Sequence, residues 1–245
     1  MTVLLKKVSY AFERGGHPII ENLSMEVRKG EFVSIIGKSG TGKSTIFKLL
    51  TGLLQQDAGE ILINNQQVIP GMVGYMPQKD LLLPWRTILE NIMIAAEIQK
   101  DVNITKEEAE RWIERAGLKG YENALPKQLS GGMRQRAAFL RTLLTGKDVL
   151  LLDEPFGALD TFTKKEMQIW LLSIWKDLNK TIIFITHDLE EAAFLSDRIL
   201  LLHRNKTIEE VVVDLPRPRH PEDVHSEKMM TLRRNLEKKI SNETD

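Results

Sequence analysis

Eight consecutive residues have the types and the spacing that are needed to hold a phosphate group. They fit the pattern G-x-x-x-x-G-K-[ST] and read Gly37, Lys38, Ser39, Gly40, Thr41, Gly42, Lys43 and Ser44. Glycines let a loop turn its backbone N–H groups toward phosphate oxygens, and Lys43 adds a full positive charge. Ser44 is the expected Mg²⁺ ligand, and Thr45 begins a helical run whose N-terminus also favours anions. The stretch predicts a nucleotide-phosphate site.

Two carboxylates follow an apolar run later in the chain. The run Val149–Leu152 leads directly into Asp153 and Glu154 and suits a central strand that is buried on both faces. Ligands of open α/β sheets bind beyond the carboxyl ends of the strands, so both carboxylates are expected beside the phosphate loop. We expect Asp153 to hold Mg²⁺ and Glu154 to act as the base for an attacking water. An acidic cap on the strand is the alternative, which the nearby phosphate loop disfavours.

A second loop has the features of an anion site. Ser130, Gly131 and Gly132 precede a helical run expected over Met133–Thr145. A serine hydroxyl and two glycine N–H groups at a helix start can bind an anion, although Ser130 could also serve only as an N-cap. The chain already has one phosphate loop, so a second such loop requires an explanation.

With these three motifs in order, the chain resembles the ATP-binding cassette (ABC) ATPases, whose signature is LSGGQ. This chain has Met133 where that family most often has Gln, while Gln135 and Arg136 match the usual continuation. The resemblance implies that Ser130, Gly131 and Gly132 contact the γ-phosphate of ATP bound to the opposite subunit. It therefore implies a head-to-tail homodimer with two ATP molecules, and Mg²⁺, at its interface.

Further positions match this family over most of the chain. The resemblance implies that Gln78 reaches Mg²⁺ and the attacking water, and that His187 bonds the γ-phosphate. It also places Asp160 in the D-loop, which crosses the dimer interface. Phe12 resembles the aromatic residue that stacks on adenine, and Tyr10 is a close competitor because stacking tolerates either ring.

The expected fold class is α/β: a P-loop NTPase of the ABC ATPase type, with a parallel-sheet core, an antiparallel β subdomain and an inserted helical subdomain at about residues 83–145. The ATPase domain is expected over residues 1–215 and a short charged tail, with a docked helix, over residues 216–245. Pro84 is expected to start one helix of the insertion, and Thr105 to cap another. Gly59–Asn65 reads as a strand that enters a hairpin turn.

Composition narrows the class of protein. The chain has 245 residues, 42% of them hydrophobic, a formal net charge of zero and no cysteine. There is no basic stripe, so nucleic acid is not an expected partner. No apolar run approaches the ~18 residues that span a bilayer. We therefore expect any membrane-spanning part to be another chain, with this one at the cytoplasmic face of the cell membrane.

The segment Leu81–Asn91 bears on the task of the ATPase. Its sequence Leu-Leu-Pro-Trp-Arg-Thr resembles the import branch for nitrate, aliphatic sulfonates, taurine and bicarbonate, to which importers of thiamine precursors are close. The resemblance implies permease subunits that are contacted near this segment and, indirectly, a substrate-binding protein. The alternatives are a soluble ABC ATPase outside transport and a nucleotide-gated interaction module.

Overall fold

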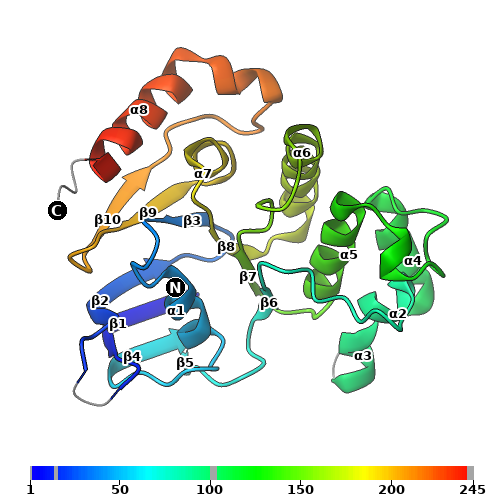
Figure 1. Cartoon of the computed structure of the whole chain (residues 1–245), viewed down its shortest axis with the longest axis horizontal. Coiled ribbons are helices and arrows are strands. Elements are labelled where there is room, and N and C mark those ends of the chain that lie inside the picture. The colour runs from blue at the N-terminus through cyan, green and yellow to red at the C-terminus, as the bar shows by residue number, and fades with distance from the viewer. Residues whose placement is uncertain (1, 14–15, 100–103, 242–245) are drawn as a thin grey trace.

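The computed structural model describes residues 2–13, 16–99 and 104–241, and its centre is a six-stranded sheet (Figure 1). Neighbouring strands are parallel except at one edge, where β10 pairs antiparallel with β9. Across the sheet the strands are β10 (Ile208–Val212), β9 (Arg198–Leu202), β3 (Phe32–Ile36), β8 (Thr181–Ile185), β7 (Val149–Asp153) and β6 (Gly74–Met76). Strands β3, β7, β8 and β9 are buried throughout, as parallel strands covered on both faces should be.

A smaller antiparallel sheet lies beside this one. Its strands, in order across the sheet, are β2 (Ile20–Val27), β1 (Val3–Tyr10), β4 (Ala58–Ile63) and β5 (Gln66–Gln67). The predicted hairpin turn is Asn64–Asn65, where both residues have positive φ angles of 51° and 63°. Asparagine tolerates this conformation better than most residues, which explains its use in tight hairpins.

Helix α1 (Lys43–Leu50) packs between the two sheets. Its residues Ile46, Phe47, Leu49 and Leu50 share an apolar core with strands of both sheets. On the opposite face of the parallel sheet, α7 (Leu189–Leu195) and α8 (Glu227–Ser241) cover β9 and the end of β3. The α/β fold with a parallel core is therefore confirmed.

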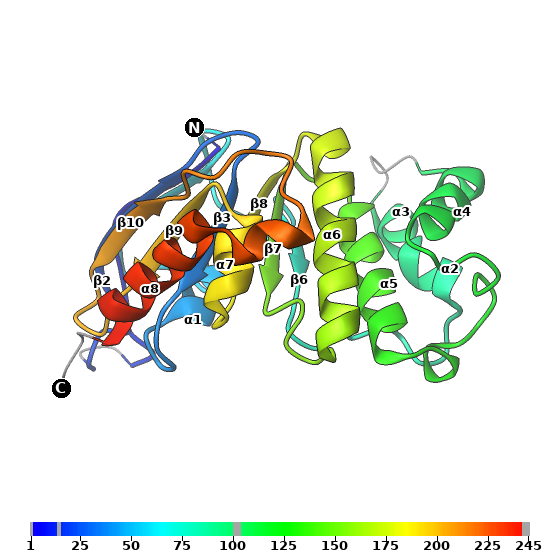
Figure 2. The same ribbon diagram turned by 90° about the horizontal axis from the view of Figure 1, so that it is seen from above.

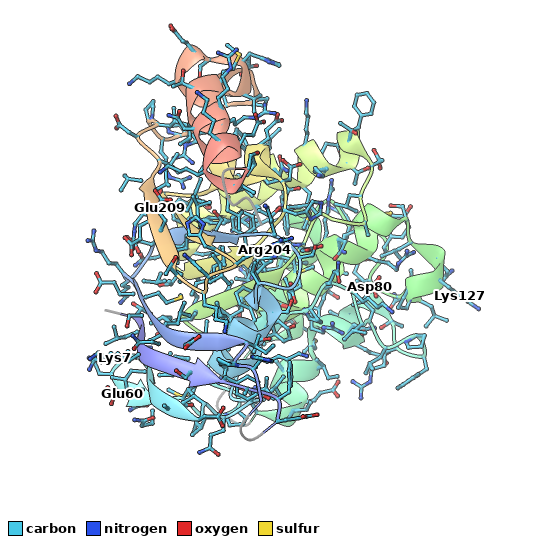
Figure 3. All side chains as sticks on the ribbon, turned by 60° about the vertical axis from the view of Figure 1, so that its left-hand side comes forward. Lys7, Glu60, Asp80, Lys127, Arg204 and Glu209 are labelled. Atoms are coloured by element: carbon cyan, nitrogen blue, oxygen red, sulfur yellow. The ribbon has the colours of Figure 1, made fainter. Side chains whose placement is uncertain are left out.

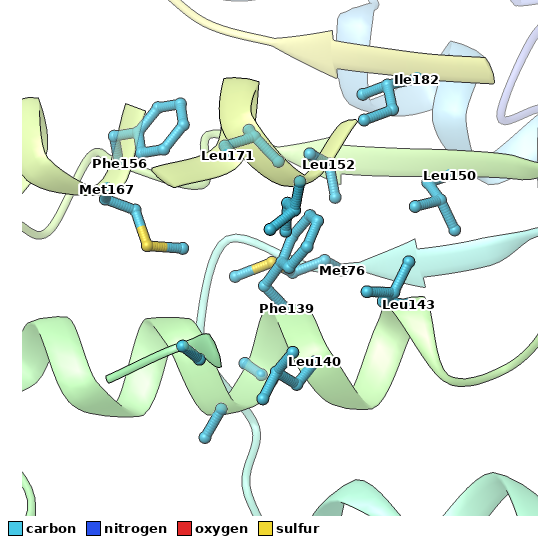
Figure 4. Packing of buried hydrophobic residues seen from close by; sticks show 14 of the residues in the cluster. Met76, Phe139, Leu140, Leu143, Leu150, Leu152, Phe156, Met167, Leu171 and Ile182 are labelled. Carbon is cyan, nitrogen blue, oxygen red and sulfur yellow. The ribbon is translucent and has the colours of Figure 1, made fainter. Parts of the chain in front are cut away.

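The helical part lies to one side of the sheet and contains α2 (Ile88–Ile92), α3 (Ile94–Ile98), α4 (Lys106–Arg115), α5 (Gly131–Leu143) and the 3₁₀ turn Pro126–Gln128. Seen from above, α6 (Thr161–Leu178) stands between α5 and the strands (Figure 2). Phe139, Leu140 and Leu143 of α5 pack in one core with Met76 of β6 and Leu150 of β7 (Figure 4). The signature helix is thus packed against β7, the strand that ends in Asp153.

Two helix boundaries differ from expectation. The helix predicted to start at Pro84 begins instead at Ile88, because Thr87 and Glu90 form a reciprocal capping box there. The signature helix begins at Gly131, two residues before the predicted Met133, because Ser130 is its N-cap. Thr105 caps α4 as predicted, by accepting a hydrogen bond from the Glu108 N–H.

The chain returns across the domain after β10. An irregular segment that contains Arg217 and Arg219 leads through the 3₁₀ turn Pro221–His225 to α8. Met229 and Leu236 of α8 are fully buried. Acidic and basic side chains are interspersed over the surface, for example Lys7 and Glu60 on the smaller sheet (Figure 3). Within the described ranges, no helix has the length and apolar character to cross a membrane.

Candidate nucleotide-binding site

The phosphate loop joins β3 to α1, as the sequence predicted. Gly37 lies against strand β9: a Cβ at this position would be 2.4 Å from the Leu202 carbonyl oxygen. Gly42 has φ of 102° and is the N-cap of α1, a conformation that side chains rarely adopt. Both glycines are therefore required by the geometry of the loop.

The side chain of Lys43 lies back over the first residues of the phosphate loop. Its ammonium donates hydrogen bonds to the carbonyl oxygens of Gly37 at 2.8 Å and Lys38 at 3.0 Å. Burial lowers the pKa of Lys43, while the charges of Glu154 and Asp153 act to raise it. The lysine, the loop and both carboxylates therefore belong to one electrostatic environment.

The other residues of the loop divide by exposure. Ser39, Gly40 and Ser44 are exposed, so they are accessible to a ligand. Thr41 and Thr45 are buried, and the Thr41 hydroxyl donates to the Lys38 carbonyl at 2.9 Å. Thr41 thus stabilises the loop, and Ser44 offers an open hydroxyl at the start of α1.

The two carboxylates stand at the carboxyl end of β7. Asp153 is its last residue and is 8% exposed. Burial and the adjacent charge of Glu154 raise the pKa of Asp153, and the Tyr75 hydrogen bond and Lys43 act against this rise. Glu154 has φ of 46°, a left-handed backbone conformation, and its N–H donates to the Ile185 carbonyl at 3.0 Å. This turn directs the second carboxylate away from the strand.

Gln78 and His187 meet at Glu154. The Gln78 side-chain amide donates to the Glu154 carboxylate, with Nε2 2.8 Å from Oε2. His187 approaches the other oxygen, with Nδ1 3.6 Å from Oε1. Three residues predicted from distant motifs are therefore brought together at one carboxylate, which can orient and deprotonate a water.

The residues present fit a bound Mg²⁺. This ion keeps several waters and takes few protein ligands besides phosphate oxygens. Ser44 offers an exposed hydroxyl, and Asp153 offers a carboxylate whose ionised form a nearby cation would favour. In the described ranges, no cluster of three or more His, Cys, Asp or Glu could hold a metal alone. When bound, the ion would neutralise charge on the phosphates.

Burial separates the two aromatic candidates. Tyr10 is 9% exposed and belongs to the core of the smaller sheet, whereas Phe12 is 64% exposed. The two rings contact each other edge to face, with centroids 5.4 Å apart. Phe12 is therefore the more accessible of the two rings.

The signature loop lies apart from the phosphate loop. Helices α1 and α5 are separated by strands of the parallel sheet in both views (Figures 1 and 2). Ser130 accepts a hydrogen bond from the Met133 N–H at 3.3 Å, so it serves as the N-cap of α5. Ser130 and Gly131 are also exposed, and Asp160, which caps α6, is exposed beside them in the fold. One chain alone does not bring the two loops together.

The sequence did not reveal Tyr75 or two arginines of α5. The Tyr75 hydroxyl lies 3.4 Å from Asp153 Oδ2, and burial together with that carboxylate raises the pKa of Tyr75 to about 12. Arg141 donates to the backbone carbonyls of Asp80 and Leu81 at 2.6 and 2.7 Å. Arg134 forms an ion pair with Asp80 at 3.1 Å. Tyr75 lies three residues before Gln78, and this proximity in sequence was the signal that could have indicated a place near the site.

Comparisons with known proteins agree with this geometry. The ABC transporter family model matches residues 20–157. The formylaminopyrimidine import ATP-binding protein ThiZ of Halalkalibacterium halodurans is 46% identical over 96% of this chain and 93% of its own. The aliphatic sulfonates import ATP-binding protein SsuB of Bacillus cereus is 39% identical, with 96% and 94% covered.

A solved structure with the same fold is the dimeric post-hydrolysis state of the ATP-binding cassette MJ0796 bound to ADP and phosphate. It is 28% identical, with a TM-score of 0.75, and the match covers 87% of this chain and all of that one. The family match spans both the phosphate loop and the carboxylates at the end of β7. The chain therefore belongs to the ABC transporter family, and it is an ATP-hydrolysing enzyme of the P-loop class.

Proposed function

We propose that this chain is the ATPase motor of a membrane import system and works at the cytoplasmic face of the membrane. The observation that carries the proposal is the meeting of Gln78 and His187 at Glu154, beside a complete phosphate loop. The relatives named for import support the transport task, since they match almost the whole length of this chain.

We assign the residue roles from this geometry together with the family resemblance. Lys43 and the loop N–H groups bind the β- and γ-phosphates, and Phe12 holds the adenine. Glu154 orients the water and accepts its proton, while Gln78 keeps one carboxylate oxygen in place. His187 contacts the γ-phosphate from the side of β8. Asp153 and Ser44 would hold Mg²⁺.

The assembly follows from the separation of the two anion loops. A two-fold pairing of identical chains would place Ser130, Gly131 and Gly132 of one over the phosphate loop of the other, with both Asp160 residues at the interface. The solved cassette of the same fold is described as a dimer, which supports this arrangement. Each ATP would then be held by two chains.

The solute class is a small polar organic molecule or anion. The two relatives carry the names of formylaminopyrimidine and aliphatic sulfonate import, and nitrate, taurine and bicarbonate importers belong to the branch that the Leu81–Asn91 segment resembles. We favour an N-formylated aminopyrimidine because the first of these relatives has the higher identity. A substrate-binding protein would deliver the solute to the permease.

The permease would contact the surface at Leu81 and Trp85, which are 58% and 73% exposed. Asn91, the end of the predicted contact segment, is fully buried and instead binds the backbone of Leu83 and Arg86. The direct contact therefore falls on the first part of the segment.

The test is purification of the tagged chain from detergent-solubilised membranes of its own cells. We expect a polytopic membrane protein to co-purify with the wild type and to be lost with Trp85→Ser. The matched control is Val212→Ser on β10, which removes another exposed apolar side chain (69%) and should keep the partner. Absence of any membrane partner from the wild type would favour a soluble ATPase outside transport. Uptake of labelled formylaminopyrimidine and sulfonate by a deletion strain then separates the two solutes.

A further inference from the structure

The first turn of α6 lies between two loops of the nucleotide site. Thr163 packs against the signature glycine: a Cβ on Gly132 would be 2.2 Å from the Thr163 methyl group. The next residue, Lys164, points to the loop that follows β8 and carries His187. The turn itself is fixed by Asp160, whose carboxylate accepts from the N–H groups of Phe162 and Thr163.

Lys164 forms two ion pairs with that loop and the helix after it. Its ammonium lies 3.1 Å from Asp188 Oδ2 and 2.9 Å from Glu191 Oε1. The side chains of Lys164 and Asp188 are 24% and 33% exposed, and that of Glu191 only 5%. Burial acts to lower the pKa of Lys164, but the hydrogen bonds and charges of Glu191 and Asp188 raise it above its ordinary value. The ammonium of Lys164 is therefore protonated at neutral pH.

The same network fixes both neighbours of His187. The Thr186 hydroxyl donates to the second oxygen of Glu191 and accepts from the Asp188 N–H at 3.0 Å. Asp188 also caps α7, by accepting from the N–H groups of Glu190 and Glu191. The His187 side chain remains 69% exposed. The backbone on each side of it is held, and the imidazole projects from this frame toward Glu154.

We propose that Lys164 is a positioning residue for His187, which it holds in reach of Glu154 and the γ-phosphate through Asp188, Glu191 and Thr186. This inference rests on the proposed role of His187. The ammonium of Lys164 is paired with Asp188 and Glu191, so its proposed action on His187 runs through the loop. Because Thr163 in the same turn contacts Gly132, the first turn of α6 links the signature loop on one side to the His187 loop on the other.

The experiment compares four variants of the full chain. Lys164→Met removes the tether, and Lys164→Arg restores a cation. The double variant Lys164→Met with Glu191→Gln also neutralises the buried carboxylate, so that the effect on His187 is measured without an unpaired charge that could impair folding. The matched control is Arg233→Met, which removes an ion pair of 2.6 Å between α8 and Glu190 of the same helix α7.

We expect kcat to fall about tenfold to a hundredfold in Lys164→Met and in the double variant, because a small misplacement at the reacting phosphate has effects of this size. ATP affinity should stay within about twofold, Lys164→Arg should recover most of kcat, and Arg233→Met should resemble the wild type. Wild-type kcat in the folded double variant, or an equal loss in Arg233→Met, would overturn the proposal.

A double-mutant cycle with His187→Ala separates this role from general stabilisation. If Lys164 acts through His187, the second substitution adds little to the first, and the two losses in kcat are strongly non-additive. If the losses in kcat of the two single variants multiply in the double variant, the inference about Lys164 is overturned, while the proposed role of His187 stands. Full activity in His187→Ala by itself removes the proposed role of His187, and the inference with it.

Discussion

At the scale of single residues, Lys43 is the lysine of the phosphate loop that we expect to bind the β- and γ-phosphates. Lys43→Ala should weaken ATP binding about a hundredfold, since a charge-assisted hydrogen bond is worth ~2–3 kcal/mol. Titration calorimetry with ATP measures this directly. Lys48→Ala is the control, because Lys48 is an exposed lysine further along the same helix. The Lys48→Ala variant should bind ATP with wild-type affinity. Unchanged affinity in Lys43→Ala would contradict the role of the loop.

Glu154 should behave differently from Lys43. Glu154→Gln keeps the shape of the side chain and can still bond Gln78, but it removes the base. We expect ATP binding to persist while hydrolysis falls by about 10²–10⁴-fold. Phosphate release at saturating ATP is the measurement. Near-normal turnover would assign the base to another residue, and His187 is the next candidate at the same position.

At the scale of elements, helix α7 is held at both ends. Asp188 caps its first turn, and the buried guanidinium of Arg219 donates to the carbonyls of Ala193, Phe194 and Ser196 at its end. Burial, followed by the charge of Arg217, lowers the pKa of Arg219 to about 10. The arginine still remains charged at neutral pH and can serve as a cationic cap.

Removal of this cap should cost stability. Arg219→Met leaves three carbonyl groups without their donor, and we expect the free energy of unfolding to fall by about 2 kcal/mol. Urea denaturation followed by circular dichroism measures the change. The control is Arg115→Met, which removes an exposed arginine that pairs with Asp177 and should change stability by less than about 1 kcal/mol. An equal fall in the free energy of unfolding in both variants would contradict the role of Arg219 as the cap of α7.

The elements themselves were largely predictable from local pattern. The apolar run Val149–Leu152 predicted the buried strand β7 to within a residue, because a strand buried on both faces tolerates few polar residues. The start of α2 was missed because Pro84 is a common first helical residue, whereas the Thr87 and Glu90 capping box decides the boundary here. Asn91, which binds the turn before that helix, gives no local signal.

The candidate site was predictable only in its motifs. Gln78, Glu154 and His187 were each expected near the phosphates, but their convergence on one carboxylate depends on the order of β6, β7 and β8 in the sheet. The ion pairs of Lys164 could not be predicted, because its partners lie 24 and 27 residues further along the chain and have no spacing rule. Local rules describe helices and loops, and the pairing of strands decides which loops meet.

At the scale of the whole molecule, half of each proposed ATP site belongs to the partner subunit. Glu154→Gln with ATP should therefore run as a dimer on size-exclusion chromatography, and with ADP as a monomer, because a ligand that binds only the dimer shifts the equilibrium toward it. Adding Ser130→Arg should restore the monomer with ATP. Full activity in Ser130→Arg, together with a specific activity independent of protein concentration, would refute the shared site.

The position of β3 in the sheet has a consequence for the synthesis of the protein. The strand that leads into the phosphate loop begins at Phe32 and pairs with β8 on one side and β9 on the other, which begin only at Thr181 and Arg198. At translation rates of roughly 5–20 residues per second, β3 waits about ten to thirty seconds for its neighbours. Throughout that interval the edges of a strand whose one polar residue is Ser34 are open to chaperones or to other nascent chains. A ribosome-bound chain should therefore acquire nucleotide affinity only after β9 has emerged from the exit tunnel, late in its own synthesis.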